Sequence, residues 1–432
     1  MYGLYTLLLF FSLVLYFPVY FIRSRFLRRE SLHFRQRCGF SIKKITSKKR
    51  SIWIHAVSVG EVLSLQNLIT QIKKKHPDWI IHFSCLTDTG YRMATEKLKD
   101  VDDIFFVPLD FRIIVKKFFR YLKPDIFVLA ESEFWPNLLR EANRATRGVL
   151  LVNGRISFRS FRRYQKMRFF VKPILTHISL YLVQTKRDKA MLEKIGVDPR
   201  VVQIAGNLKA EITLPILEQS ELDELRESIN IPQGAMVIVA GSVRKGEEGP
   251  LLDAFSIAAK SNRNLVLILA PRHPDRANEV EKICQKYLLK AQKRTDISPE
   301  QDWNVLILDT LGELAKFYAL SDVAFVGGSL VPWGGHNLLE PAFYAKPVFF
   351  GPHMDNFVHL AEIFIEAGAA RIVKSRNDLV RMFSMQDEAE FQEMGQKAKS
   401  TLISLQGATD KTLQAIDSMM SVQIGDERKR HG

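Results

Sequence analysis

Cysteine is scarce in this chain, and its three copies lie far apart, at positions 38, 85 and 284. There is no Cys-x-x-Cys pair and no cluster of cysteine and histidine with zinc-binding spacing, so a disulfide scaffold and a zinc site are both disfavoured, and a reducing compartment fits. The patterns G-x-G-x-x-G, G-x-x-x-x-G-K-[S/T], H-E-x-x-H and G-x-S-x-G are also absent. These absences argue against a dinucleotide site, a P-loop, a zinc protease and a serine hydrolase. We expect neither a metal ion nor a redox cofactor.

Acidic residues are nearly missing from two stretches, although the whole chain holds 47 aspartates and glutamates against 62 lysines and arginines. Only Glu30 opposes the basic side chains between Arg23 and Arg50, and no acid opposes those between Arg159 and Lys172. A net charge of +15 that is placed so unevenly indicates an anionic partner, such as lipid headgroups, a phosphorylated substrate or nucleic acid.

Charge is missing altogether from residues 1–22, a length that suffices to span the apolar core of a bilayer. No small-residue cleavage site follows, which argues against a removable signal peptide. Because arginines follow directly, the positive-inside rule places the N-terminus outside and the rest of the chain in the cytoplasm. Two alternatives stay open: a buried helix of the soluble fold, or a helix lying in the membrane interface, because Pro18 can kink the segment.

From residue 51 onward, short apolar runs alternate with longer helical patterns. This is the rhythm of a parallel sheet with helices on both faces. It runs from residues 51–55 to 181–184 and restarts at 236–240. The sequence therefore predicts two doubly wound α/β domains facing a cleft, with ligands at the carboxyl ends of the strands. The predicted parts are a membrane anchor at 1–22, a basic connector at 23–50, an N-terminal domain at 51–208, a C-terminal domain at 209–405, and a helix and polar tail at 406–432.

Charged residues follow the predicted strands of the first domain. Glu61 lies in such a loop, where partial desolvation would raise its pKa and suit general-base work, although Ser58-x-x-Glu61 also fits a helix capping box. Glu131 and Glu133 follow an apolar strand, and we expect one acid in the cleft and the other at a helix start. Lys209, at the domain junction, can reach a phosphate or carboxylate, or can simply occupy a surface turn.

Glycine loops mark the second domain. In residues 322–352 an apolar strand is followed by Gly327-Gly328, then Gly334-Gly335, and then a helix predicted to open at Asn337. Free backbone N–H groups and a helix dipole would make an anion cradle there. Glu340 could accept hydrogen bonds from sugar hydroxyls, although Asn337 and Glu340 also fit an N-cap with its capping-box partner.

Three further strand-to-helix turns, at 241–248, 271–276 and 309–314, carry cations or glycine. Arg272 could pair bidentately with a phosphate. Each turn alone fits an ordinary turn with solvated charges equally well.

Together these motifs resemble one family, the Kdo transferases of bacterial lipopolysaccharide synthesis. That family moves 3-deoxy-D-manno-octulosonic acid (Kdo) from its CMP ester to the lipid A precursor. The matching motifs are SVGE (58–61), ESEFWPN (131–137), NGRIS (153–157), AGNLK (205–209), GSVRKGEE (241–248), PRHPDR (271–276), DTLGEL (309–314) and GGHNLLEP (334–341). Each motif alone is weak, whereas their joint occurrence in this order is specific. NGRIS varies the commoner NARLS form of the family.

The resemblance implies a GT-B fold and an inverting, metal-independent transfer of Kdo from CMP-Kdo to lipid IVA at the cytoplasmic face of the inner membrane. It implies that Glu61 is the general base and that Glu131 and Lys209 stabilise the transition state. The CMP contacts that it implies are Pro271, Arg272, Leu311, Gly312, Glu313, Asn337, Leu338, Leu339 and Glu340. The anchor, spanning or monotopic, and the basic stretches Arg23–Arg50 and Arg159–Lys172 would hold the enzyme at an anionic membrane surface.

Two other functions fit part of the sequence. A GT-B enzyme that uses a UDP-sugar would carry similar loops. A non-catalytic membrane protein that binds anionic lipid or nucleic acid would explain the charge, but neither Glu61 nor the glycine loops. Phenylalanine and arginine alternate only in residues 158–170, so we expect no nucleic-acid partner.

Overall fold

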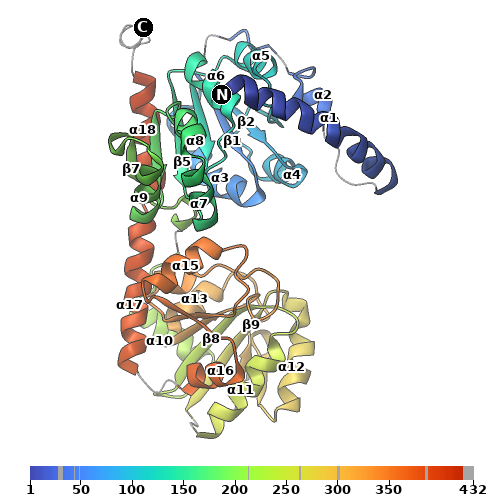
Figure 1. Cartoon of the computed structure of the whole chain (residues 1–432). Coiled ribbons are helices and arrows are strands. Elements are labelled where there is room, and N and C mark those ends of the chain that lie inside the picture. Colours follow the sequence, from blue (N-terminus) through green and yellow to red (C-terminus); the bar gives the residue numbers. More distant parts are fainter. Residues whose placement is uncertain are drawn as a thin grey trace. The chain divides into compact units, whose positions relative to one another are not determined.

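The computed structural model describes residues 1–27, 33–42, 44–47, 49–212, 214–261, 264–298, 302–384 and 388–421, and of residues 16–27 and 388 it describes only the backbone. The chain divides into two compact units. Unit 1 comprises Met1–Glu211 with Leu405–Gly432, and unit 2 comprises Ile212–Ser404. Each unit is built around one parallel sheet with helices packed against it (Figure 1).

Unit 1 holds a seven-stranded parallel sheet in the order β3-β2-β1-β4-β5-β6-β7. Its strands are β1 (Ser51–Ala56), β2 (Ile80–Cys85), β3 (Asp103–Phe106), β4 (Ile126–Ala130), β5 (Gly148–Gly154), β6 (Leu180–Val183) and β7 (Val202–Ile204). Its helices are α1 (Tyr2–Leu27), α2 (Phe34–Arg37), α3 (Val59–Lys75), α4 (Asp88–Lys97), α5 (Arg112–Leu122), α6 (Pro136–Ala145), α7 (Phe158–Lys166), α8 (Arg168–Leu175), α9 (Lys186–Ile195) and α18 (Ala408–Ser421), with short 3-10 turns at Pro199–Val201 and Leu208–Ala210.

Unit 2 repeats this architecture with the strand order β10-β11-β9-β8-β12-β13-β14. Its strands are β8 (Met236–Val243), β9 (Leu265–Pro271), β10 (Ala291–Lys293), β11 (Val305–Ile307), β12 (Val323–Val326), β13 (Val348–Phe350) and β14 (Ala370–Ile372). Its helices are α10 (Gln219–Ser228), α11 (Glu248–Ser261), α12 (Ala277–Lys286), α13 (Leu314–Leu320), α14 (Leu339–Phe343), α15 (Val358–Glu366), α16 (Arg376–Ser384) and α17 (Glu388–Leu405), with 3-10 turns at Pro274–Arg276 and Arg294–Asp296.

The central strands are apolar along their whole length because both faces of each sheet are covered. Every residue of β1, β4, β5 and β9 is buried. In unit 1 one apolar cluster fills the face under α3, α4 and α18, and a second fills the opposite face under α5, α6, α8 and α9. Continuous apolar strands of this kind are typical of parallel sheets. The prediction of two doubly wound α/β folds is confirmed.

The N-terminal helix α1 is fixed to unit 1 at its first turn. The hydroxyl of Tyr2 lies 2.5 Å from Nε2 of His177, and the ring of Tyr2 lies 4.6 Å from the guanidinium of Arg140. The side-chain amide of Asn137 donates to the hydroxyl of Thr6 at 3.3 Å. Among the described helices, none is both long enough and apolar enough to cross a bilayer. The predicted anchor at 1–22 lies partly outside the described side chains.

The basic connector also lies only partly within the description, which leaves out residues 28–32, 43 and 48 and the side chains of residues 23–27. One of its described arginines, Arg37, is 9% exposed and donates hydrogen bonds to the carbonyl oxygens of Leu86 and Val107. Its guanidinium also lies over the ring of Phe106. This arginine therefore belongs to the fold of unit 1 rather than to an exposed basic surface.

Candidate active site

Unit 1 has its topological switch point between β1 and β4, which are neighbours in the sheet. From β1 the chain builds the sheet outward through β2, and from β4 it builds outward in the other direction. In open parallel sheets the loops at such a point diverge and leave room for a ligand. Glu61 lies in the segment after β1, and Glu131 follows β4 directly.

Glu61 is held by the start of α3 and is almost completely buried, with 6% exposure. Its Oε2 accepts from the backbone N–H of Val57 at 2.8 Å, and its Oε1 accepts from the hydroxyl of Ser58 at 2.9 Å. Ser58 is the N-cap and accepts from the N–H of Glu61, which is one half of the predicted capping box. The other half differs, because Glu61 accepts from the N–H of Val57 rather than from that of Ser58. The capping role does not use up the carboxylate. Burial, and then the negative charge of Glu131, raise the pKa of Glu61 to about 7.

Glu131, directly after β4, has an unusual backbone conformation, with φ of 55°. Non-glycine residues in this region often mark a position that the fold holds for a purpose. Its Oε2 accepts from Nε of Arg155 at 2.8 Å. Burial and the charge of Glu131 also raise the pKa of Glu133, which lies two residues further on.

Lys209 reaches this pair of acids from a 3-10 turn near the end of unit 1's first segment. A Cβ atom added to Gly60 would lie 3.4 Å from Nζ of Lys209, so the lysine crosses the backbone beside Glu61. Burial lowers the pKa of Lys209, whereas Glu131 and Glu61 raise it. Because both acids act on the pKa of Lys209, the lysine lies within electrostatic reach of Glu61 and of Glu131.

Three buried amide side chains fix the turn that carries Lys209. Oδ1 of Asn207 accepts from the N–H of Lys209 at 2.9 Å, and its amide donates to Gln184 at 3.0 Å. Gln184 in turn donates to the carbonyl oxygen of Asn153, and Oδ1 of Asn153 accepts from the N–H of Leu208. The network therefore ties the lysine to the carboxyl end of β5.

The three residues that the sequence assigned to catalysis lie together in unit 1. No role was predicted from the sequence for Arg155, the partner of Glu131, or for the amides that hold the lysine turn. A signal was available, because Asn153 and Gly154 end β5, the neighbour of β4, and Arg155 follows them, so the three residues lie at the same edge of the sheet as Glu131.

Unit 2 places the predicted CMP-binding residues in the loops at the carboxyl ends of its strands. Pro271 ends β9 and exposed Arg272 follows it. Leu311, Gly312 and Glu313 lie between β11 and α13, with the side chain of Leu311 81% exposed. Asn337 to Glu340 lie between β12 and the end of the next short helix.

The helix after the glycine loop differs from the prediction. We expected it to open at Asn337, but α14 begins at Leu339 and has only five residues. Oδ1 of Asn337 accepts from the N–H of Leu339 at 3.1 Å, so the side chain takes one of the N–H groups expected to be free. The amide of Asn337 donates to Oε1 of Glu340, also at 3.1 Å, instead of forming a capping box. Burial raises the pKa of Glu340.

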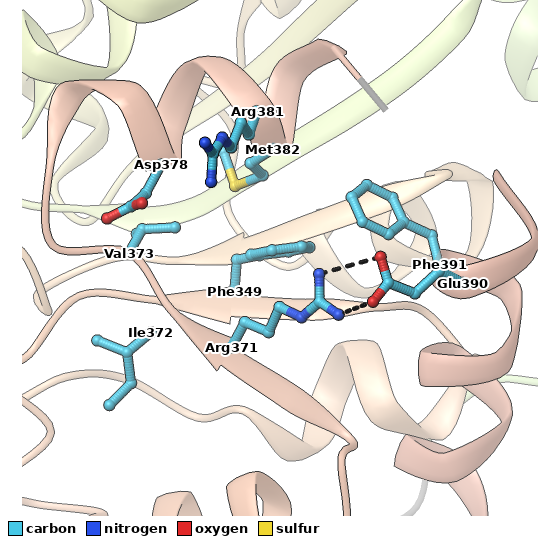
Figure 2. Close-up of a pocket in the computed structure, with 9 residues that line it drawn as sticks. All are labelled: Phe349, Arg371, Ile372, Val373, Asp378, Arg381, Met382, Glu390 and Phe391. Atoms are coloured by element: carbon cyan, nitrogen blue, oxygen red, sulfur yellow. Dashed lines mark hydrogen bonds and ion pairs between the residues drawn. The ribbon is translucent and has the colours of Figure 1, made fainter. Parts of the chain in front are cut away.

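A separate cavity of about 380 Å³ lies beside β13 and β14 of unit 2. Figure 2 shows Arg371 and Glu390 joined across one part of it, with Asp378 and Arg381 above. None of the predicted site residues lines this cavity.

Comparison with known proteins decides the family. Residues 32–212, which contain Glu61, Glu131 and Lys209, match the family described as 3-deoxy-D-manno-octulosonic-acid transferase (kdotransferase). A 3-deoxy-D-manno-octulosonic acid transferase from Haemophilus influenzae is 31% identical over 344 residues, which are 79% of this chain and 80% of that protein. The chain belongs to the Kdo transferase family.

Two further relatives extend this assignment. A bifunctional glycosyltransferase/methyltransferase from Fusobacterium nucleatum is 39% identical over 319 residues, which are 72% of this chain. The chain spans about half of that protein, since the match covers 48% of it. Among solved structures, MurG from Acinetobacter baumannii is similar in fold, with a TM-score of 0.54, 12% identity, and coverage of 86% of this chain and 99% of that one. The resemblance to Kdo transferases found in the sequence motifs is therefore confirmed, and with it a glycosyltransferase of GT-B-like fold.

Proposed function

We propose that this Kdo transferase moves Kdo from CMP-Kdo to the lipid A precursor, lipid IVA, with inversion at the sugar and without a metal ion. The observation that carries the proposal is the state of Glu61. It is buried beside a second carboxylate, with its pKa raised to about 7, at the switch point of unit 1. A carboxylate whose pKa lies near the working pH is suited to general-base catalysis.

In the proposed reaction the oxygen of an acceptor hydroxyl attacks the anomeric carbon of Kdo. The new carbon–oxygen bond forms as the bond to the phosphate oxygen of CMP breaks, and CMP leaves with the electron pair. The proton of the hydroxyl passes to Glu61. Attack opposite the leaving group requires one base on that face of the sugar, as in inverting glycoside hydrolysis, with the acceptor hydroxyl in place of water.

Glu131 and Lys209 are the proposed stabilisers of the transition state. Lys209 brings a positive charge into a site with two buried acids, and Arg155 forms an ion pair with Glu131. Charges fixed in advance at a site with little water stabilise charge that develops during reaction.

The proposed donor site lies in unit 2. CMP leaves as a stable anion, so it needs positive potential rather than an acid catalyst. Arg272 is exposed at the carboxyl end of β9, where it can meet the phosphate, and the loop residues 311–313 and 337–340 would hold the nucleotide. The carboxylate of Glu340 is half-buried and can accept hydrogen bonds from sugar hydroxyls.

The proposed acceptor is embedded in a membrane, and unit 1 has a surface that suits one. Helices α7 and α8, with the residue between them, expose four large apolar side chains amid arginines and lysines: Phe158, Met167, Phe169 and Phe170. Exposed aromatics among basic residues favour the surface of an anionic bilayer. We place this surface at the cytoplasmic face of the inner membrane.

Helix α1 is the second proposed membrane contact. Its first turn is bound to α6 and His177 of unit 1, and the side chains of Leu7, Leu8, Phe11 and Leu15 are exposed. A helix whose first turn is bound to the catalytic unit cannot also carry that turn to the far side of the bilayer. These contacts therefore favour the monotopic arrangement over the spanning one.

The experiment that tests the function incubates the detergent-purified protein with lipid IVA and CMP-Kdo generated in situ. Mass spectrometry of the lipid should show gains in whole Kdo units, and their number gives the count of sugars added. CMP should inhibit the reaction and UDP should not. Absence of any mass gain from a protein that binds CMP would reject the proposed donor or acceptor, and inhibition by UDP alone would favour a UDP-sugar enzyme.

A further inference from the structure

A positively charged cluster lies at the switch point of unit 2. Strands β8 and β12 are neighbours there, and the chain extends the sheet in opposite directions from them. The loop after β8 carries Arg244, and the loop after β12 carries Trp333 and His336. The N–H of Gly327, directly after β12, donates to the carbonyl oxygen of Gly241 in β8 at 2.8 Å, which joins the two segments close to these loops. The cluster thus occupies in unit 2 the place that Glu61 and Glu131 occupy in unit 1.

Arg244 is the centre of the cluster. Its Nε donates to Nε2 of His336 at 3.3 Å, and its Nη1 lies 3.1 Å from Nε2 of His273. The guanidinium lies 5.0 Å from the ring centre of Trp333, which is 54% exposed. Within the residues that the structure describes, no carboxylate forms an ion pair with this guanidinium. An arginine that is oriented but unpaired at a ligand-binding edge suits an anionic group.

The histidine of the cluster is neutral. Burial, and then the charges of Arg244, Arg272 and His273, lower the pKa of His336 to about 4. Because its Nε2 accepts from Arg244, its proton lies on Nδ1. The cluster therefore offers N–H donors in a positive potential and contributes no negative charge of its own.

The backbone around the cluster is fixed before any ligand binds. Glu247 accepts hydrogen bonds from four backbone N–H groups, one at Arg244 and three at residues 328–330, so its carboxylate joins both loops. Gly328 has φ of 70°, and a Cβ atom there would lie 2.8 Å from Cδ2 of His336. Only a glycine at that position lets the imidazole lie against the loop. Groups held in this way lose little entropy when they bind a ligand.

We propose that Arg244 and His336 bind the carboxylate of the sugar acid in the donor, with Trp333 covering one face of the guanidinium. The inference rests on the proposed function, in which the donor is CMP-Kdo. The anomeric carbon of Kdo bears both the carboxylate and the phosphate ester. A donor whose CMP group lies in the nucleotide loops therefore presents its carboxylate nearby. The planar carboxylate matches the fork of a guanidinium.

Two anions of the donor could in principle use this cluster, and CMP distinguishes them because it has the phosphate but lacks the carboxylate. The test compares wild type with Arg244→Gln, measuring kcat/KM for CMP-Kdo and the inhibition constant of CMP. The control is Lys245→Gln, which removes an exposed charge from the adjacent position of the same loop. A second variant, His336→Gln, keeps a hydrogen-bond acceptor for Arg244.

We expect Arg244→Gln to lower kcat/KM for CMP-Kdo by roughly ten- to a hundredfold, as for the loss of charge-assisted hydrogen bonds, and to leave CMP inhibition unchanged. His336→Gln should lose less, and Lys245→Gln should behave as wild type. Retained CMP inhibition also shows that the variant is folded. An equal loss for CMP and CMP-Kdo would assign the cluster to the phosphate, and no loss would remove it from the donor site; either overturns the proposal. A wild-type protein that binds CMP without transferring Kdo would reject the proposed function itself.

Discussion

Unit 1 and unit 2 each carry a Gly-Glu pair after the strand at the switch point: Gly60-Glu61 in the first turn of α3, which follows β1, and Gly246-Glu247 in the loop between β8 and α11. Both glutamates are buried, and burial raises the pKa of both. Glu61 accepts one backbone N–H and one hydroxyl, and it faces a second carboxylate. Glu247 accepts four backbone N–H groups, and its loop carries cations.

This difference shows that the surroundings of a carboxylate, rather than the Gly-Glu motif that carries it, determine its role. Four N–H donors saturate Glu247 and make it a crosslink between two loops. Glu61 keeps unused acceptor capacity and a pKa near neutrality, which is the condition for taking a proton. The neighbouring charges also differ. Burial, and then a second acid, raise the pKa of Glu61, whereas burial, and then neighbouring cations, lower the pKa of His336 to about 4.

The largest expected effect comes from Glu61→Gln. Loss of the general base should lower kcat/KM by roughly 10²–10⁴-fold.

The same Glu61→Gln variant should be more stable than wild type above pH 7. The folded-state pKa of Glu61 is raised to about 7, so its stabilising contribution is complete below the unfolded pKa and is lost as pH rises through about 7. Steady-state kinetics and thermal unfolding at several pH values measure both effects.

The control for that variant is Glu133→Gln, in the same site region, with a raised pKa but no assigned catalytic role. Its loss of activity should be much smaller. Equal losses in the two variants would show that general charge, rather than a base at position 61, matters.

Glu247→Gln should have the opposite effect: its main consequence should be a loss of stability. A glutamine offers one acceptor oxygen and places an amide N–H among backbone donors, which leaves buried N–H groups unsatisfied at a cost of roughly 1–3 kcal/mol. Amide hydrogen exchange at residues 328–330 should accelerate, and CMP should bind more weakly. Glu279→Gln is the control, since the side chain of Glu279 is 61% exposed. Unchanged exchange at residues 328–330 would mean that the carboxylate does not hold the loop.

The pH profile of the reaction sharpens the comparison further. In wild type, kcat/KM should rise with pH through a midpoint near the pKa of Glu61, about 7, and then level off. Glu131→Gln removes a neighbouring negative charge, so the midpoint should fall by roughly one pH unit, whatever happens to the plateau. Ser58→Ala removes a hydrogen bond that lowers this pKa and should move the midpoint upward. Shifts in the same direction would contradict the assigned surroundings of Glu61.

Whether a feature of the fold or of the site could be predicted from the sequence depended on how far apart along the chain its contacting residues lie. Glu61 and Glu131 were predictable because strand order alone brings their loops to one edge of the sheet. The saturation of Glu247 was not, since three of its four partners lie 81–83 residues further along the chain. The burial of Arg37 likewise depends on distant contacts, with the carbonyl oxygens of Leu86 and Val107. The late start of α14 instead accompanies local hydrogen bonds of Asn337 to Leu339 and Glu340.

The smallest expected effect concerns the acceptor, which we propose meets unit 1, whereas the donor site is proposed in unit 2. Unit 1 exposes the basic surface of α7 and α8, so Arg162→Gln should weaken binding to anionic vesicles by about 1 kcal/mol, or roughly fivefold. The KM for lipid IVA in those vesicles should rise accordingly, whereas Arg244→Gln in unit 2 should affect the use of CMP-Kdo; CMP inhibition should stay unchanged in both variants. Arg92→Gln, an exposed substitution on α4 of the same unit, is the control.

Because the contribution of Arg162 is electrostatic, high salt or neutral lipid should abolish the difference between Arg162→Gln and wild type. A defect that persists in neutral detergent would instead place Arg162 at the acceptor itself, and turnover unchanged in anionic vesicles would remove α7 from the membrane-facing surface of unit 1.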